Sequence, residues 1–338
     1  MGVVVGFTSS VPIATATAVD ARWHEAVAAG MRIGRVQLDW KAVEPTPEHY
    51  DLNELDERLA VLSSDHIRPF LLLDSIDGEI PSDLRSGLDA NELTWDHPTM
   101  TARHAKMIQH IMPVLQRHGV WIIALANEVG NLLDKLEPTQ RAETTRQMVA
   151  FVTASRAEVK RLEPGLAVVV TVREQQFEAG DTEAAFIALS DVASFNFYCS
   201  RFASSLEVQS NVEAIRGYID DMLARAGTKS VVVQELGCHA GYTDKPSVTR
   251  ANPDLQARFF DVVLGELAVR ERLRAAIIFQ MIDWNPDLVE SEYSKAFRAE
   301  GLPESFIQQY AESLETVGLL RLRDGTARPA WATFLSHL

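Results

Sequence analysis

The sequence predicts a (β/α)8 barrel that fills the whole chain, residues 1–338, as a single domain. Short apolar runs alternate with longer amphipathic segments eight times, which is the pattern of a closed parallel barrel. The runs are apolar nearly throughout, as expected of parallel strands that are covered by helices on one face and by core on the other. No linker, charge block or internal repeat interrupts the chain, so one domain is the simplest organisation.

The predicted elements follow one another in a regular order. A doubly wound sheet is the competing fold, but it usually carries a glycine-rich phosphate turn after its first strand, and Gly-Phe-Thr-Ser-Ser is not such a turn. Gly30, Gly119 and Gly227 fall where a helix ends and a strand begins. The expected strands are Val3–Thr8, Ile33–Trp40, Ile67–Asp74, Trp121–Asn127, Ala167–Val172, Val192–Tyr198, Ser230–Glu235 and Ala276–Trp284. The expected helices are Ala18–Ala29, Leu52–Ser63, Thr101–Arg117, Thr139–Leu162, Val212–Ala226 and Asn252–Arg270.

Composition excludes several classes of protein. The chain has 32 Lys and Arg against 47 Asp and Glu, a net charge of -15, which argues against a nucleic-acid partner. No apolar run approaches the ~20 residues of a membrane span.

The first ten residues lack the basic start and long apolar stretch of a secretory signal, so we expect a cytoplasmic protein. A secreted chain whose signal peptide had been removed would look the same.

Two of the predicted strands are followed by a glutamate. Glu128 follows Ala-Leu-Ala-Asn127 after the fourth run, and Glu235 follows Val-Val-Gln at the end of the seventh. Catalytic side chains lie at the carboxyl ends of barrel strands, and strands four and seven lie roughly opposite each other, so both carboxylates are expected at one central pocket. One glutamate alone would more simply cap a helix or pair with an arginine.

Two facing carboxylates suit the hydrolysis of a glycosidic bond. One, with a raised pKa, protonates the leaving oxygen, while the other attacks the anomeric carbon or activates water. A separation of about 5–5.5 Å gives retention of configuration, and about 6.5–9.5 Å gives inversion.

With these residues and those around them, the chain resembles glycoside hydrolase clan A, whose barrels carry the acid/base on strand 4 and the nucleophile on strand 7. The resemblance implies that Glu128 is the general acid/base and Glu235 the nucleophile. Asn127 matches the clan's Asn-Glu pair, which implies a hydrogen bond from Asn127 to the sugar 2-hydroxyl. Gln234-Glu235-Leu236-Gly237 matches the nucleophile motif.

Further matches extend the resemblance over nearly the whole chain. Trp284 matches the aromatic floor under the reacting sugar, Tyr198 the tyrosine that hydrogen-bonds the nucleophile, and Arg35 the strand 2 arginine that orients it. Residues 40–56 match the clan's W-x-x-x-E-P…Y-D…L-D run, and residues 318–331 match its closing strand–turn–helix. The chain departs from the clan at Val129, where proline is common, and at the third strand, which ends in Leu-Asp74 without a histidine.

Several of these residues have simpler alternatives. Trp284 could pack at the rim of the barrel, and the Tyr198 hydroxyl could point into water. Arg35 could keep Glu235 ionised, or it could pair with Asp39 or Glu44.

Other polar residues near the strand ends are secondary candidates. Asp74 and His239 could bind sugar hydroxyls or be ordinary loop residues. Cys199 and Cys238 follow neighbouring strands; the sequence favours two free, half-buried thiols, and a disulfide requires an oxidising compartment. A catalytic Cys238–His239 dyad is disfavoured, because adjacent residues rarely aim at each other.

Two long connections are expected to shape the substrate site. They lie between Asp74 and Thr101 and between Asn285 and Phe306, and Trp95, Asp96 and Tyr293 are their candidates for outer sugar contacts.

We therefore expect a retaining glycoside hydrolase acting on oligo- or polysaccharides, with carbohydrate as its partner and no cofactor. The oligomeric state, the sugar and the linkage stay open. A transglycosylase would use the same residues, and a carbohydrate-binding barrel would use the same pocket without turnover.

A metal-dependent barrel hydrolase is a further alternative. Such an enzyme usually has His-x-His on its first strand, which this chain lacks, and the nine histidines of the chain are scattered.

Overall fold

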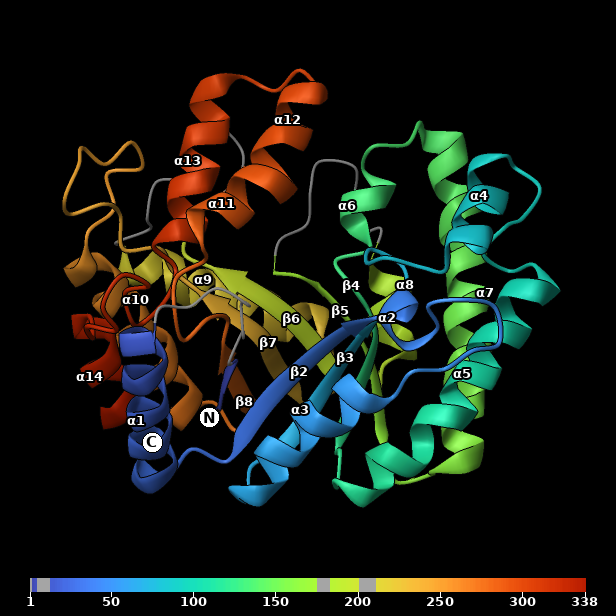
Figure 1. Ribbon diagram of the computed structural model, residues 1–338, viewed down its shortest axis with the longest axis horizontal. Coiled ribbons are helices and arrows are strands. Elements are labelled where there is room, and N and C mark those ends of the chain that lie inside the picture. Colours follow the sequence, from blue (N-terminus) through green and yellow to red (C-terminus); the bar gives the residue numbers. More distant parts are fainter. Residues whose placement is uncertain (1, 5–12, 175–182, 201–210) are drawn as a thin grey trace. The chain divides into compact units, whose positions relative to one another are not determined.

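The computed structural model describes residues 2–4, 13–174, 183–200 and 211–338 (Figure 1). Its strands follow one another in sheet order from β1 to β8 as a closed barrel, which confirms the predicted (β/α)8 fold. The strands are β1 (Gly2–Val4), β2 (Ile33–Asp39), β3 (Arg68–Asp74), β4 (Ile122–Asn127), β5 (Ala167–Arg173), β6 (Ala193–Tyr198), β7 (Val231–Gly237) and β8 (Leu273–Ile278).

Helices alternate with these strands. The longer ones are α1 (Ile13–Ala29), α3 (Asn53–Ser64), α5 (Pro98–Arg117), α7 (Pro138–Leu162), α9 (Val212–Arg225), α10 (Pro253–Val269), α13 (Glu304–Glu315) and α14 (Pro329–Ser336). The shorter ones are α2 (Trp40–Val43), α4 (Ser82–Asp89), α6 (Gly130–Leu133), α8 (Ala184–Leu189), α11 (Pro286–Val289), the π-helix η1 (Glu290–Ser294) and α12 (Lys295–Ala299). No helix in the described parts of the chain is long and apolar enough to cross a membrane.

The residues form two compact units. One unit contains residues 33–196 and 222–232, and its strands β2 to β5 pair in parallel, with Val36 opposite Leu71 and Ile123 opposite Val168. Its core is built from the fully buried residues Phe70, Leu71, Leu72, Ile122, Ile123 and Phe151. The other unit contains residues 1–32, 197–221 and 233–338, where β1 pairs with β8 and α10 packs against α14.

The sequence located most strands and the long helices to within a few residues, but it misplaced the end of β8. That strand ends at Ile278, six residues before Trp284. Beyond it the chain pairs with the segment before α14 instead: Leu320 N donates to Met281 O at 2.8 Å, and Asp283 N donates to Leu320 O at 3.2 Å. The two expected substrate loops also contain helices that periodicity did not reveal, namely α4 in the first and α11 to α13 in the second.

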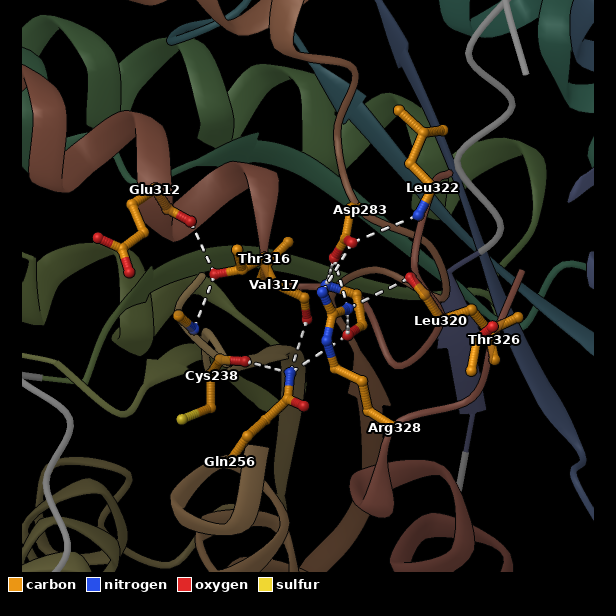
Figure 2. A network of polar contacts seen from close by, with 12 residues as sticks. Cys238, Gln256, Asp283, Glu312, Thr316, Val317, Leu320, Leu322, Thr326 and Arg328 are labelled. Carbon is orange, nitrogen blue, oxygen red and sulfur yellow. Dashed lines mark hydrogen bonds and ion pairs between the residues drawn. The ribbon is translucent and has the colours of Figure 1, made fainter. Parts of the chain in front are cut away.

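A buried ion pair fixes the chain after β8. Arg328 donates to both carboxylate oxygens of Asp283, at 2.7 and 2.8 Å, and both side chains are more than nine-tenths buried (Figure 2). The same guanidinium donates to Gly318 O at 2.8 Å. Burial raises the pKa of Asp283 to about 6, and the attraction of Arg328 opposes that rise.

Gln256 of α10 extends the same network toward β7. Its amide nitrogen donates to Cys238 O at 2.8 Å (Figure 2). The same nitrogen donates to Gly318 O at 3.2 Å. The segment that follows β7 is thereby held to the segment that precedes α14.

Arg328→Met should lower the free energy of unfolding by about 3–5 kcal/mol, because it leaves the buried Asp283 without its counter-charge. Denaturant unfolding at pH 7 measures the effect. Arg323→Met is the matched control, since Arg323 is 73% exposed and its removal should change stability by no more than about 0.5 kcal/mol. Equal midpoints for the two variants would contradict the role assigned to the pair.

Candidate active site

The backbone at the end of β4 is irregular where the sequence places Asn127 and Glu128. The pairing with β5 shifts register between Ala124 and Asn127, which marks a β-bulge. Glu128 then adopts a left-handed conformation with φ of 41°, and its N–H donates to Thr171 O at 2.9 Å. A glutamate rarely adopts this conformation, and such outliers gather at functional sites, where the surrounding structure imposes them.

The Glu128 carboxylate accepts a hydrogen bond on each oxygen. Asn196 Nδ2 donates to Oε1 at 2.8 Å, and Asn131 Nδ2 donates to Oε2 at 2.8 Å. Asn196 Nδ2 also donates to Asn127 Oδ1 at 3.0 Å, so one amide group orients both members of the Asn127-Glu128 pair.

Sequence reasoning missed Asn196. It is fully buried in β6, two residues before Tyr198. Side chains two apart in a strand share a face, so the alternation Asn-Phe-Tyr could have identified Asn196 as pointing the same way as Tyr198. Its amide side chain in a strand rich in aromatic residues was the available signal.

The carboxylate at the end of β7 is held by a tyrosine. Glu235 is only 5% exposed, and the Tyr198 hydroxyl donates to its Oε2 at 2.5 Å. The structure therefore brings these two predicted site residues together.

Tyr198 lies directly against Gly237. A Cβ atom on Gly237 would lie 2.4 Å from Tyr198 Cε1, so only glycine leaves room for the ring in this position. Cys199 N donates to Gly237 O at 3.0 Å, which joins the ends of β6 and β7 beside the Tyr198–Glu235 pair.

The expectation of two free thiols was wrong. Cys199 and Cys238 form a disulfide with a Cα–Cα distance of 5.0 Å, and both are about 1% exposed. Each cysteine comes directly after a strand end that main-chain hydrogen bonding holds next to the other. The sequence placed the two residues near each other but could not give the distance that decides between thiols and a disulfide.

Trp284 lies in an aromatic group beside Tyr198. Phe279 contacts Tyr198 edge-on at 5.5 Å between ring centroids, and Trp284 stacks on Phe279 at 6.4 Å. Tyr293 contacts Trp284 edge-on at 5.6 Å. Trp284 is half-buried and lies in the connection after β8 rather than at the strand end.

The remaining predicted residues lie in or next to strands. Arg35 is a buried residue of β2, and Asp74 is buried at the end of β3 opposite Asp39. His239 is buried two residues after β7. Glu44, an alternative partner for Arg35, accepts hydrogen bonds from Arg103 at 2.8 Å and from Trp40 Nε1 at 2.9 Å.

Two of the expected outer contacts have other partners. Trp95 is 4% exposed and packs edge-on against Phe151 at 5.5 Å, so it is a core residue. Asp96 is ion-paired with Arg146 at 3.0 Å.

The histidine, cysteine and acidic side chains of the described residues form no cluster that could bind a metal ion. His104 is fully buried between the hydroxyls of Ser75 and Ser155, at 2.8 and 2.7 Å. Burial lowers its pKa to about 3, so it stays neutral at physiological pH and acts as a core hydrogen-bonding residue.

Solved structures share the fold, although no protein-family model and no curated protein matches the sequence. A GH5_18 variant from Bifidobacterium longum subsp. longum ATCC 55813, in complex with Manb1-4GlcNAc, matches with a TM-score of 0.70 at 13% identity. That match covers 94% of this chain and 71% of the other.

Two further structures agree. The β-glycosidase BGL167 matches with a TM-score of 0.64 at 14% identity, covering 94% of this chain and 84% of the other. The exo-β-1,4-mannosidase Op5Man5 from Opitutaceae bacterium strain TAV5 matches with a TM-score of 0.66 at 16% identity, covering 100% of this chain and 59% of the other. At these identities the likeness establishes the fold: the chain is a (β/α)8 barrel of the kind found in these glycosidases.

Proposed function

We propose that the protein is a glycoside hydrolase that cleaves β-glycosidic bonds with retention of configuration, with Glu235 as nucleophile and Glu128 as acid/base. The observation that carries the proposal is the buried Glu235 carboxylate, which accepts the Tyr198 hydroxyl at the carboxyl end of a barrel strand. Barrel enzymes hold their catalytic groups at these strand ends. Glu128 adds a second carboxylate at a strand end. Its backbone has a left-handed conformation, which a glutamate rarely adopts.

In the first step, Glu235 attacks the anomeric carbon while Glu128 gives its proton to the leaving oxygen. The bond from the anomeric carbon to that oxygen breaks, and a covalent glycosyl-enzyme forms. Tyr198 holds the attacking carboxylate in one orientation before the reaction.

In the second step, Glu128 accepts a proton from a water molecule, and that water attacks the anomeric carbon and releases Glu235. Asn127, oriented by Asn196, is the proposed partner of the sugar 2-hydroxyl. Trp284 is the proposed floor under the ring, since sugar C–H groups pack well on an aromatic face. The chain supplies both the proton and the nucleophile, so the reaction needs no cofactor.

The test is hydrolysis of aryl β-glycosides by the wild-type chain, with product configuration followed by proton NMR. The panel covers mannose, glucose, galactose, xylose and fucose, with β-mannan and β-glucan oligomers. β-Mannosides come first, because one structural neighbour holds Manb1-4GlcNAc and another is a mannosidase. A β-configured first product supports the proposal, and an α-configured one overturns the retaining mechanism.

The same assay separates the alternatives. Products longer than the substrate would indicate a transglycosylase, in which a sugar replaces water in the second step. Sugar binding without turnover by the wild-type chain would indicate a carbohydrate-binding barrel.

Gly237→Ala should lower kcat about 10- to 100-fold, because the added methyl group displaces the Tyr198 ring and removes its hydrogen bond to the charged Glu235. Steady-state kinetics on the best substrate measures the loss. Gly217→Ala on α9 is the control, since no heavy atom lies within 4 Å of its new Cβ. Full activity in a folded Gly237→Ala variant would contradict the positioning role of Tyr198.

A further inference from the structure

Asn131 forms a closed turn with Glu128. Its backbone N–H donates to Glu128 O at 2.8 Å, and its side-chain Nδ2 donates to Glu128 Oε2 at 2.8 Å. Asn131 is exposed and is the second residue of α6, so burial does not explain why its amide lies against this carboxylate. No family motif that the sequence shares includes this residue.

The two oxygens of Glu128 are chemically different. Oε1 faces the Nδ2 group of Asn196, which is buried and also bonded to Asn127. A protonated oxygen is a poorer acceptor, so a proton on Oε1 would weaken the bond from the buried Asn196, whereas the exposed Asn131 can turn away from a proton on Oε2. The proton of the acid form therefore belongs on Oε2, the oxygen that faces Asn131.

We infer that Asn131 is a positioning residue that occupies, in the unliganded site, the place of the leaving-group oxygen beside Glu128 Oε2. This inference rests on the proposed acid/base role of Glu128. Between turnovers Oε2 exchanges its proton with water, and the Asn131 amide stabilises the carboxylate while it is ionised. When Oε2 is protonated again, the amide gives way to the glycosidic oxygen of the substrate, because a protonated Oε2 and an amide N–H are both donors.

The proton balance follows from this exchange. With substrate bound, the Oε2 proton passes to the glycosidic oxygen, which keeps the electron pair of the broken bond and leaves as a neutral hydroxyl. The ionised Oε2 then accepts one proton from the attacking water, and the cycle closes. Asn131 donates to Oε2 only in the ionised state.

Several charged groups lie around α6. Arg141 of α7 donates to Leu133 O at 3.0 Å and to Leu136 O at 3.0 Å. The other charged groups pair with one another. Arg173 of β5 contacts Asp134 at 2.8 Å and Glu183 at 3.6 Å, and Arg225 of α9 contacts Glu183 at 3.5 Å. Gly130 N donates to Glu183 Oε1 at 3.3 Å. Glu174 follows Arg173 at the end of β5, and Glu235 is the other carboxylate of the proposed reaction. These groups are the same in every variant used below, so they do not account for a difference between variants.

The first measurement is a titration of the Glu128 side chain by carbon-13 NMR in the full chain labelled at glutamate carboxyls, with Glu128→Gln to assign the signal. Asn131→Ala should raise the pKa of Glu128 by about 0.5–1 unit, because one hydrogen bond to the ionised form is lost. Asn131→Asp should raise it further, because a second negative charge then faces Oε2. Asn53→Ala, an exposed asparagine that begins α3, should leave the pKa unchanged.

The second measurement is the pH profile of kcat/KM, whose alkaline limb reports the acid of the free enzyme. That limb should move to higher pH by the same amount in Asn131→Ala and stay in place in Asn53→Ala. An unchanged Glu128 titration in folded Asn131→Ala and Asn131→Asp overturns the inference. A uniform loss of activity without a shifted limb also overturns it, since that is a purely structural effect.

If the wild-type chain hydrolyses no glycoside, the proposed function fails, while the NMR titration still decides whether Asn131 controls the protonation of Glu128.

Discussion

Replacing Glu235 by alanine is expected to lower kcat for aryl β-glycosides on the order of 10⁴- to 10⁶-fold, the range found when a catalytic nucleophile is removed. The physical reason is that the proposed nucleophile is then missing, while the proposed contacts of Trp284 and Asn127 with the sugar persist. KM should therefore change far less than kcat. Steady-state kinetics on the best substrate of the panel measures both.

Azide provides the decisive readout for Glu235→Ala. The small anion fits the space left by the carboxylate and should restore part of the activity, with release of an α-configured glycosyl azide. Wild-type enzyme should not respond to azide in this way. Glu213→Ala, which removes an exposed glutamate from α9, is the control and should keep full activity. If Glu235→Ala keeps its activity without azide, Glu235 is not the nucleophile.

Glu128→Ala is expected to reduce turnover by an amount that depends on the leaving group. For substrates with a sugar or alkyl leaving group the loss should be about 10²- to 10⁴-fold, the usual contribution of general acid–base catalysis. For a dinitrophenyl glycoside the first step needs no proton, so its rate should fall little and the glycosyl-enzyme should accumulate. A rapid burst followed by slow turnover in stopped-flow assays would record this.

A loss that is the same for every leaving group would contradict the acid/base assignment for Glu128. Glu128→Gln is the isosteric comparison, because it keeps the size of the side chain and can no longer transfer the proton. The two substitutions should show the same dependence on the leaving group.

The sequence predicted the architecture well because most strands are continuous apolar runs followed by polar residues. Glu128 and Glu235 could be singled out, since a charged residue directly after a buried strand is costly without a purpose. The hydrogen bond from Tyr198 to Glu235 could also be predicted, although only through family resemblance. The position of each glutamate after its strand depends on local sequence order, which a single chain displays fully.

What the sequence could not predict depends on contacts between distant segments. The end of β8 was misplaced because Met281 and Ile282 continue the apolar run while they pair with Leu320. The disulfide required a distance between two strand ends, and the burial of Trp95 required the position of Phe151. The helices η1, α12 and α13 were missed because their aromatic residues Tyr293, Phe297 and Tyr310 pack against one another in a local cluster.

The left-handed backbone at Glu128 has a consequence for engineering this protein. A residue with a side chain pays about 1–2 kcal/mol for that conformation, and glycine does not. Glu128→Gly relieves this strain, loses the hydrogen bonds from Asn131 and Asn196, and removes the proposed acid/base. The strain relief offsets part of the lost stability, so a search that selects variants by heat resistance alone protects this glutamate poorly, and such a screen must also score turnover at every round.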